Sequence, residues 1–303
     1  MDFFSDYTLR NVMLGTLLLG MGSGVVGVFV LLRRQSLIGD AVSHAALPGI
    51  VIAFLLTGTK DISVLLTGAA LSGLIGTLCI TAIVGTTKID TDGAQGIVLG
   101  VFLGLGFLLL THVQKSPDSA KAGLDKFVFG QAATIMQRDV ILIAAVESVI
   151  AATIFLFWKE FKLATFDPEF ASVMGFSTKK IELIITALTV PAIVVGIQAV
   201  GVILMSALLV APAAAARQWT DKLSFMGIAA ALFGGLAGAG GSIISSQVPK
   251  LATGPVIVLI LTAIAVVSIV FSPRRGVLQR ILKHKSLKNA VRLSRPKTVT
   301  TVA

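Results

Sequence analysis

Long apolar runs, separated by short clusters of charged residues, make up most of the chain. All but one are close to the roughly 20 residues that a helix needs to cross the hydrocarbon core of a bilayer. Polar and apolar residues do not alternate as they would in the strands of a membrane barrel. The pattern predicts an all-α fold, a polytopic membrane helix bundle of about eight to nine transmembrane helices, from the runs 11–32, 36–56, 62–85, 94–110, 140–158, 183–216, 223–246 and 255–272.

The longest run, 183–216, has 34 residues without a charge, which is short for two full crossings and long for one. Cytoplasmic loops carry the excess of Lys and Arg, so Arg33 and Arg34 are expected inside. The basic C-terminal segment is then also inside only if this run goes out and comes back. We therefore expect two short helices hinged around residues 196–201, giving nine crossings, or eight and a re-entrant hairpin, with the N-terminus outside.

Composition agrees with a membrane location, because 55% of residues are hydrophobic, 13% are charged and the mean hydropathy is +0.94. Soluble domains carry about 25% charged residues, so a water-soluble fold is excluded. The net charge of +10 does not indicate nucleic-acid binding, since nine of the 25 Lys and Arg residues follow residue 273. We expect a transmembrane domain over 1–273 and a basic cytoplasmic tail over 274–303, beside anionic lipid.

Asp40 and His44 interrupt the second run. Residues four apart on a helix share a face, one turn above the other. A carboxylate within the membrane is costly and must face a partner or a wet cavity. Carboxylate oxygen and imidazole nitrogen suit manganese, zinc or iron(II), so the pair is a candidate metal site on a transport path. The alternative is a structural Asp–His pair that locks two helices together.

Pro48 adds a third candidate ligand to this site. It has no N–H group, so the carbonyl of His44 loses its helical donor and becomes available. The single cysteine, Cys79, excludes a metal site built from several cysteines and an intrachain disulfide.

Glu147 lies within the run 140–158, where it either lines a path or is a structural, hydrogen-bonded carboxyl in the bundle; we favour the structural role. The chain has no G-x-x-x-x-G-K-[ST] sequence. It is therefore not expected to be an enzyme that hydrolyses ATP. The H-E-x-x-H sequence of membrane zinc proteases is also missing.

Several segments resemble, in order along the chain, the metal-specific ABC permeases that import manganese, zinc or iron. The stretch LLRRQSLIGDAVSHAALPGIVIAFLL is similar to the second membrane helix of that family, and its GDAVSHAALPG block is highly specific. Further matches are TTKIDTDGAQGIVLGVFLGLG, LDKFVFG, FDPEFASVMGFSTKK and VGVILMSALLVAPAAAARQW. The resemblance covers roughly residues 8–272 and leaves out the basic tail.

The resemblance implies a type II-like importer, in which two permease chains enclose the path and two cytoplasmic ABC ATPase subunits bind below. An extracellular metal-binding lipoprotein delivers the ion. The second permease chain is expected to be an identical copy, with a different permease as the alternative. Residues that match Asp40 and His44 line the path and contact the metal in that family. Its cytoplasmic loop docks on the ATPase, which makes five residues candidates for coupling: Phe166, Asp167, Pro168, Glu169 and Gly175.

The expected function is the permease subunit of an ATP-driven importer of divalent metal ions in the bacterial cell membrane, with 1–273 as the permease domain. Manganese is the first candidate, because carboxylate and carbonyl oxygens are a hard ligand set; zinc and iron(II) are alternatives. No cofactor is expected to be bound permanently, and nucleic acid is not an expected partner. Two other classes stay open: a stand-alone proton-coupled secondary metal transporter that uses Glu147 and Asp40, and a membrane metalloenzyme.

Overall fold

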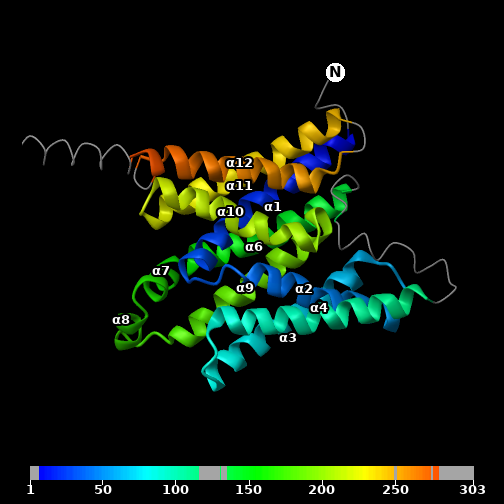
Figure 1. Ribbon diagram of the computed structural model, residues 1–303, viewed down its shortest axis with the longest axis horizontal. Coiled ribbons are helices and arrows are strands. Elements are labelled where there is room, and N and C mark those ends of the chain that lie inside the picture. The colour runs from blue at the N-terminus through cyan, green and yellow to red at the C-terminus, as the bar shows by residue number, and fades with distance from the viewer. Residues whose placement is uncertain (1–6, 116–129, 131–134, 249–250, 274–275, 280–303) are drawn as a thin grey trace, which may run out of the picture.

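The computed structural model describes residues 7–115, 130, 135–248, 251–273 and 276–279. All regular elements in these ranges are helices, and they form an elongated bundle (Figure 1). The predicted all-α fold is confirmed. Most of the LDKFVFG segment and nearly all of the basic tail lie outside the described residues. The helices are α1 (Tyr7–Leu32), α2 (Ile38–Thr57), α3 (Ile62–Thr86), α4 (Thr91–Gln114), α6 (Gln137–Leu156), α7 (Trp158–Phe166), α8 (Pro168–Val173), α9 (Thr178–Val200), α10 (Val202–Trp219), α11 (Leu223–Gln247) and α12 (Thr253–Phe271).

Eight of the described helices are long and apolar enough to cross a membrane: α1, α2, α3, α4, α6, α9, α11 and α12. Helix α10 has 18 residues and follows α9 directly. The two helices meet at Gly201, whose φ of 89° strongly favours glycine. Figure 1 shows α10 returning to the end of the molecule from which α9 starts, so the predicted out-and-back path is confirmed.

The prediction that both of these helices are short is wrong for α9. This helix begins at Thr178 and has 23 residues, because Lys179, Lys180 and Glu182 belong to its first turns. A charged residue marks the limit of what enters hydrocarbon, but a helix continues past it into the interface. The apolar run therefore underestimated the helix by about one turn.

Described basic residues are divided unequally between the two ends of the bundle. Arg10, Lys60, Lys115 and Arg138 lie at the end that holds the start of α1. The end that holds α8 and the α3–α4 turn carries Arg33, Arg34, Lys88, Lys159, Lys162, Lys179, Lys180, Arg217 and Lys222. By the positive-inside rule the latter end faces the cytoplasm.

Helices α1 and α11 cross at a contact made of glycines. A methyl group on Gly20 would overlap the backbone carbonyl of Gly234, and one on Gly238 would overlap that of Thr16. The close approach brings the buried hydroxyls of Thr16 and Ser242 within 2.8 Å of each other, and the Ser242 hydroxyl also donates to the Gly238 carbonyl at 2.9 Å. Gly234 and Gly238 of α11 thus form a packing surface, which is a common role of small residues between membrane helices.

A second close contact fixes α2 against α3. Added methyl groups on Gly49 and on Gly68 would each overlap the backbone of the opposite glycine. Beside them the buried hydroxyl of Ser72 donates to the carbonyl of Ala45 at 2.6 Å. These contacts set the depth and rotation of α2, which carries Asp40 and His44.

The α1–α11 contact leads to a prediction for Gly234→Ala. The new methyl group meets the Gly20 backbone, which cannot move aside as a side chain would, so we expect a loss of about 1–3 kcal/mol. Gly227→Ala on the same helix is the control, because nothing lies within 4 Å of its added methyl group. Thermal unfolding in detergent should show a lower midpoint for Gly234→Ala and an unchanged or higher one for Gly227→Ala. Equal midpoints would contradict the proposed close contact.

Candidate metal site and coupling segment

Asp40 and His44 lie in the first two turns of α2, one turn apart. Between residues 38 and 51 they are the two positions that are not buried, and every other side chain of that stretch is buried within the chain. The predicted shared face therefore exists, and it is the open face of an otherwise enclosed helix. A pair that served only to lock two helices of this chain together would be expected to be enclosed as well.

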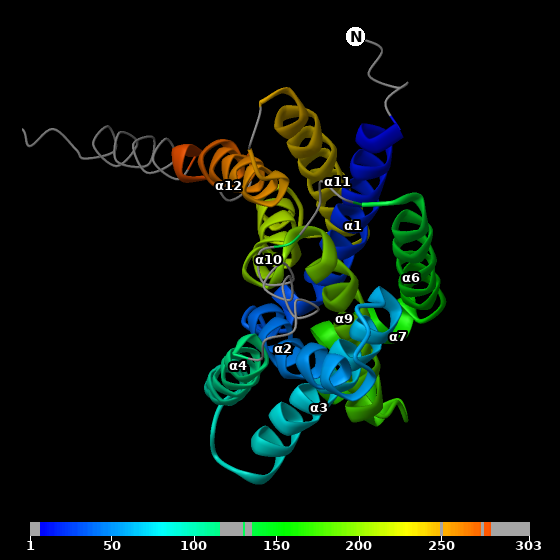
Figure 2. The same cartoon turned by 90° about the vertical axis from the view of Figure 1, so that its right-hand side faces the viewer.

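The neighbours of the pair on α2 show which way this face points. Ala41, on one side of Asp40, packs with Ala94 and Val98 of α4 and with Ile80 of α3. Gly39, on its other side, faces Ser206 and Leu209 of α10. The open face thus lies between the contacts of α2 with α4 and with α10, and Figure 2 shows α2 between these two helices.

The two side chains have unused ligand capacity. The Nδ1 atom of His44 is buried and has no hydrogen-bond partner within the described ranges. Asp40 is close enough to His44 to act on it electrostatically. Among the residues that the structure describes, no group of three or more His, Cys, Asp or Glu side chains could hold a metal ion. As candidate ligands, Asp40 and His44 would make up two of the roughly four to six that a divalent transition metal takes.

The surroundings of Pro48 bear on the third predicted ligand. The helix continues through Pro48 to Thr57. The Ser72 hydroxyl donates to Ala45, the residue after His44, and so does not occupy the His44 carbonyl itself. Use of that carbonyl as a ligand stays a prediction.

Glu147 lies elsewhere in the bundle. Its side chain on α6 is 6% exposed, contacts Gly22 of α1, and both carboxyl oxygens lack a hydrogen-bond partner in the described part of the chain. It lines a cavity of about 230 Å³ between α1, α6 and α11. Figure 2 shows α6 and α4 on opposite sides of the molecule. The structure does not bring Glu147 to Asp40 and His44, and its structural role stays a prediction.

The candidate coupling residues form a short helix–turn unit at the cytoplasmic end. Asp167 caps α8, because its Oδ1 accepts a hydrogen bond from the Phe170 amide at 2.9 Å. Pro168 occupies the first position of α8, where its missing N–H costs nothing. Gly175 has a φ of 87° and reverses the chain toward α9. Glu169 is exposed in the first turn.

Sequence reasoning missed the apolar side chains of this unit. Phe170, Val173 and Met174 are exposed, Val173 to 83%. Three exposed apolar side chains beside a charged helix start indicate a surface that a partner covers. The available signal was the segment FASVMGF, in which apolar residues occur within an otherwise polar stretch.

A model of the ABC 3 transport family matches residues 5–272. The chain belongs to this family. The resemblance seen in the motifs is thereby confirmed for the whole range in which it was found. The chain is accordingly a multi-pass protein of the bacterial plasma membrane, as its apolar helices indicate.

Relatives of this ABC 3 family chain include metal transport proteins. The zinc transport system membrane protein TroC of Treponema pallidum is 67% identical over 94% of this chain and 96% of its own length. The manganese transport system membrane protein MntC of Bacillus subtilis is 46% identical over 91% of this chain and 64% of its own. A solved structure of PsaBC from Streptococcus pneumoniae in complex with Fab has a TM-score of 0.80 at 31% identity, covering 93% of this chain and 97% of that one.

The cap of α8 yields a prediction that separates its backbone role from its charge. Asp167→Ala removes the acceptor of the Phe170 amide, which costs about 0.5–2 kcal/mol of helix stability. Asp167→Asn removes the charge and keeps an equally good cap. Hydrogen exchange of the purified protein should therefore show faster exchange over residues 168–174 in Asp167→Ala and near-native exchange in Asp167→Asn. Equal exchange in both variants would mean that the cap does not hold this helix.

Proposed function

We propose that this chain is the permease subunit of an ABC importer for divalent transition metal ions, and that Asp40 and His44 bind the ion on its way. The observation that carries the proposal is the open face of α2, on which these two ligand side chains alone remain unburied between residues 38 and 51. An ionisable residue at membrane depth is retained where it serves a pathway. The names of the relatives, which refer to zinc and manganese transport, support the same class of cargo.

A second permease chain would complete the site. Two ligands from each of two identical chains give four around a two-fold axis, in the closed symmetry that most oligomers adopt. A mixed set of oxygen and nitrogen atoms suits manganese and zinc and holds neither as tightly as a four-cysteine site would hold zinc. Manganese is the first candidate, because carboxylate favours the harder ion; zinc and iron(II) follow. The ion is cargo, and no permanently bound cofactor is needed.

Energy for transport would come from separate ATPase subunits. The chain has no phosphate-binding loop sequence. The exposed apolar side chains of α8, at the basic end of the bundle, offer a docking surface for such a subunit. An extracellular metal-binding lipoprotein would deliver the ion to the opposite end.

The proton-coupled alternative receives no support from the geometry. A relay needs its carboxylates along one route, but Glu147 lies on α6, at the edge of the bundle, and Asp40 on α2, beside α4 (Figure 2). An ABC importer needs no such relay.

The proposal predicts that Asp40→Asn and His44→Gln lower cellular accumulation of the transported metal at least about tenfold, as losing a ligand costs well over 1 kcal/mol. Both substitutions approximately keep side-chain size, and each replaces the carboxylate or imidazole with a neutral amide, which is a weaker ligand for a transition metal ion. Elemental analysis of cells that express each variant with its ATPase would measure the effect and identify the metal.

Asp61→Asn and His112→Gln are the matched controls, because they make the same chemical changes at exposed positions. Asp61 caps α3 by accepting a hydrogen bond from the Ser63 amide, and an asparagine side chain caps a helix equally well. Membrane abundance of every variant is measured in parallel. Normal metal accumulation in Asp40→Asn or His44→Gln, at normal abundance, would refute the assigned site.

A further inference from the structure

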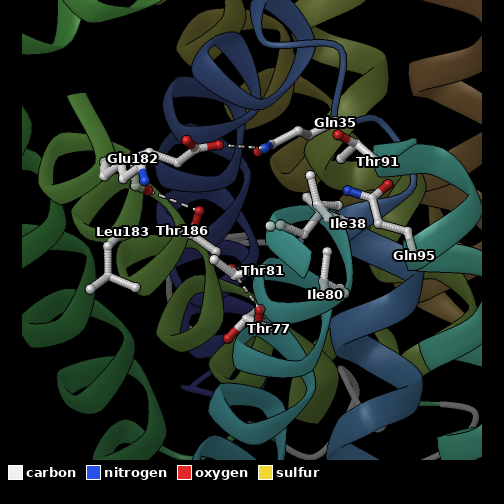
Figure 3. Close-up of a pocket in the computed structure, with 13 residues that line it drawn as sticks. Gln35, Ile38, Thr77, Ile80, Thr81, Thr91, Gln95, Glu182, Leu183 and Thr186 are labelled. Atoms are coloured by element: carbon white, nitrogen blue, oxygen red, sulfur yellow. Dashed lines mark hydrogen bonds between the residues drawn. The ribbon is translucent and has the colours of Figure 1, made fainter. Parts of the chain in front are cut away.

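Three polar side chains join the start of α9 to the turn between α1 and α2. Arg33 Nη2 lies 3.0 Å from Glu182 Oε1, and Gln35 Nε2 donates to the same oxygen at 3.3 Å. Figure 3 shows Gln35 and Glu182 pointing toward each other across the mouth of a cavity. Gln35 and Glu182 are 147 positions apart in sequence, so these contacts join two segments that are distant along the chain. We call Arg33, Gln35 and Glu182 the clasp.

At its Glu182 end, the clasp is connected to α8 through backbone hydrogen bonds in the turn before α9. Backbone bonds from Gly175 N to Ser172 O, at 3.1 Å, and from Phe176 N to Ala171 O, at 3.0 Å, fold the end of α8 onto the turn that precedes α9. Glu182 follows one turn into α9. A displacement of α8 therefore moves Glu182 with it, because little flexible chain lies between them.

On the other side the clasp is held to the start of α2. Arg34 has a φ of 57°, the positive value that closes this tight turn. The Gln35 carbonyl accepts a hydrogen bond from the Ile38 amide at 3.0 Å, and Gln35 N donates to Val30 O at 3.0 Å. Gln35 is thus fixed to both α1 and α2, five residues before Asp40. A displacement of the Gln35 side chain is therefore expected to move the first turn of α2, which carries the candidate ligands.

The other end of the coupling segment follows a different route. Helix α7 is anchored on α1 by edge-to-face contacts of Phe29 with Trp158 and with Phe161, whose ring centroids lie 6.0 and 5.8 Å apart. These apolar contacts lie in the last turn of α1, where the Phe29 carbonyl accepts a hydrogen bond from the Arg33 amide at 3.0 Å, so α7 approaches the clasp through α1. Movement of α8 can reach α2 through α9 and the clasp.

Space for such a movement exists beside the clasp. A cavity of about 320 Å³ lies between the starts of α2, α4 and α9 and the end of α3. Gln95 is fully buried at its wall, and neither amide atom has a hydrogen-bond partner among the described residues (Figure 3). A buried amide without partners needs an explanation. Water in the adjoining cavity would satisfy this amide, and a shift of the helices that closes the cavity would bring it to new partners.

The ion pair between Arg33 and Glu182 favours this particular arrangement of the clasp. The Arg33 side chain is only 13% exposed and that of Glu182 is 47% exposed. Burial lowers the pKa of Arg33 from its ordinary value, and the negative charge of Glu182 opposes that shift. A buried charge that loses its partner is left uncompensated, so the turn and α9 are expected to move as a unit.

From these contacts we propose that Glu182 is a positioning residue that transmits displacement of α8, through Arg33 and Gln35, to the metal-binding start of α2. The proposal rests on the proposed function and identifies the physical link between the ATPase-facing segment and the metal site. A coupling claim requires an element with two arrangements, and the cavity beside the clasp leaves room for the second.

The test uses the whole complex, permease with its ATPase subunits, in proteoliposomes with the manganese-loaded lipoprotein. Metal uptake and ATP hydrolysis are measured together, and their ratio is the readout. Glu182→Ala should lower metal uptake per ATP about tenfold, within the roughly 5- to 150-fold range of coupling between sites. Assembly and basal ATPase activity are measured in the same preparations, because Glu182→Ala leaves the charge of Arg33 without its partner. A merely structural role would lower uptake and hydrolysis together and leave the ratio unchanged.

The exchange of charges is the second variant. Arg33→Glu combined with Glu182→Arg rebuilds the ion pair in the opposite sense and should restore at least half of the ratio lost in either single variant. Neutralisation of Arg217 and Asp221, an ion pair at 3.6 Å between residues four apart, is the matched control. It joins the end of α10 to its own loop and should leave the ratio unchanged.

Two outcomes would overturn the proposal. One is a wild-type ratio in Glu182→Ala. The other is a charge exchange that folds and hydrolyses ATP but recovers no coupling, which would also decide the question if Glu182→Ala failed to fold. Both differ from failure of the proposed function, in which the wild-type complex itself would transport no metal.

Discussion

The cost of placing charge in hydrocarbon is the constraint on which the rest of this molecule depends. The related cost of unpaired backbone N–H and C=O groups makes every membrane segment a helix, since no other local structure satisfies its own backbone groups. The cost of charge also sorts the ionisable residues. The described Lys and Arg residues lie toward the ends of the helices, whereas Asp40, His44 and Glu147 are ionisable side chains within the apolar stretches of α2 and α6. Each of these three residues needs a physical explanation, and the surroundings of Asp40 and His44 differ from those of Glu147.

Asp40 and His44 are partly open, whereas Glu147 is enclosed. The Glu147 carboxyl lies where a methyl group on Gly22 would be, beside the cavity between α1, α6 and α11. The open pair lies on a helix that α3 holds tightly, through the glycine contact at Gly49 and the Ser72 hydrogen bond. Rigid support beneath an open face is the arrangement that a binding site requires, because ligands must be held in place before the ion arrives. The contrast between these surroundings distinguishes a candidate pathway residue from a packing residue.

Much of the fold could be predicted, because apolar runs and charges report directly on what enters the membrane. The break at Gly201 lay within the predicted hinge, since a charge-free run too long for one crossing must bend somewhere. The start of α9 could not be found this way, because hydropathy marks the edge of hydrocarbon and a helix extends beyond it. That Asp40 and His44 share a face followed from their spacing. Which neighbours flank that face depends on Ala94 and Leu209, residues far away in sequence, and no local pattern indicates that they meet there. The link between Gln35 and Glu182 is non-local in the same way.

Transport also requires that binding be temporary. An ion held by a complete, rigid ligand set would not leave, and conduction needs binding weak enough to reverse. This chain supplies two ligands, at the first turns of a helix whose far part is fixed to α3 and whose start is joined to α9 by polar contacts. The two attachments differ physically: close backbone packing cannot slide without overlap, whereas an ion pair and a hydrogen bond beside a cavity can adjust. Adjustment at the start of α2 would alter the distance between the ligands of facing chains without disturbing the bundle. The same helix can thus be rigid where it packs and adjustable where it binds.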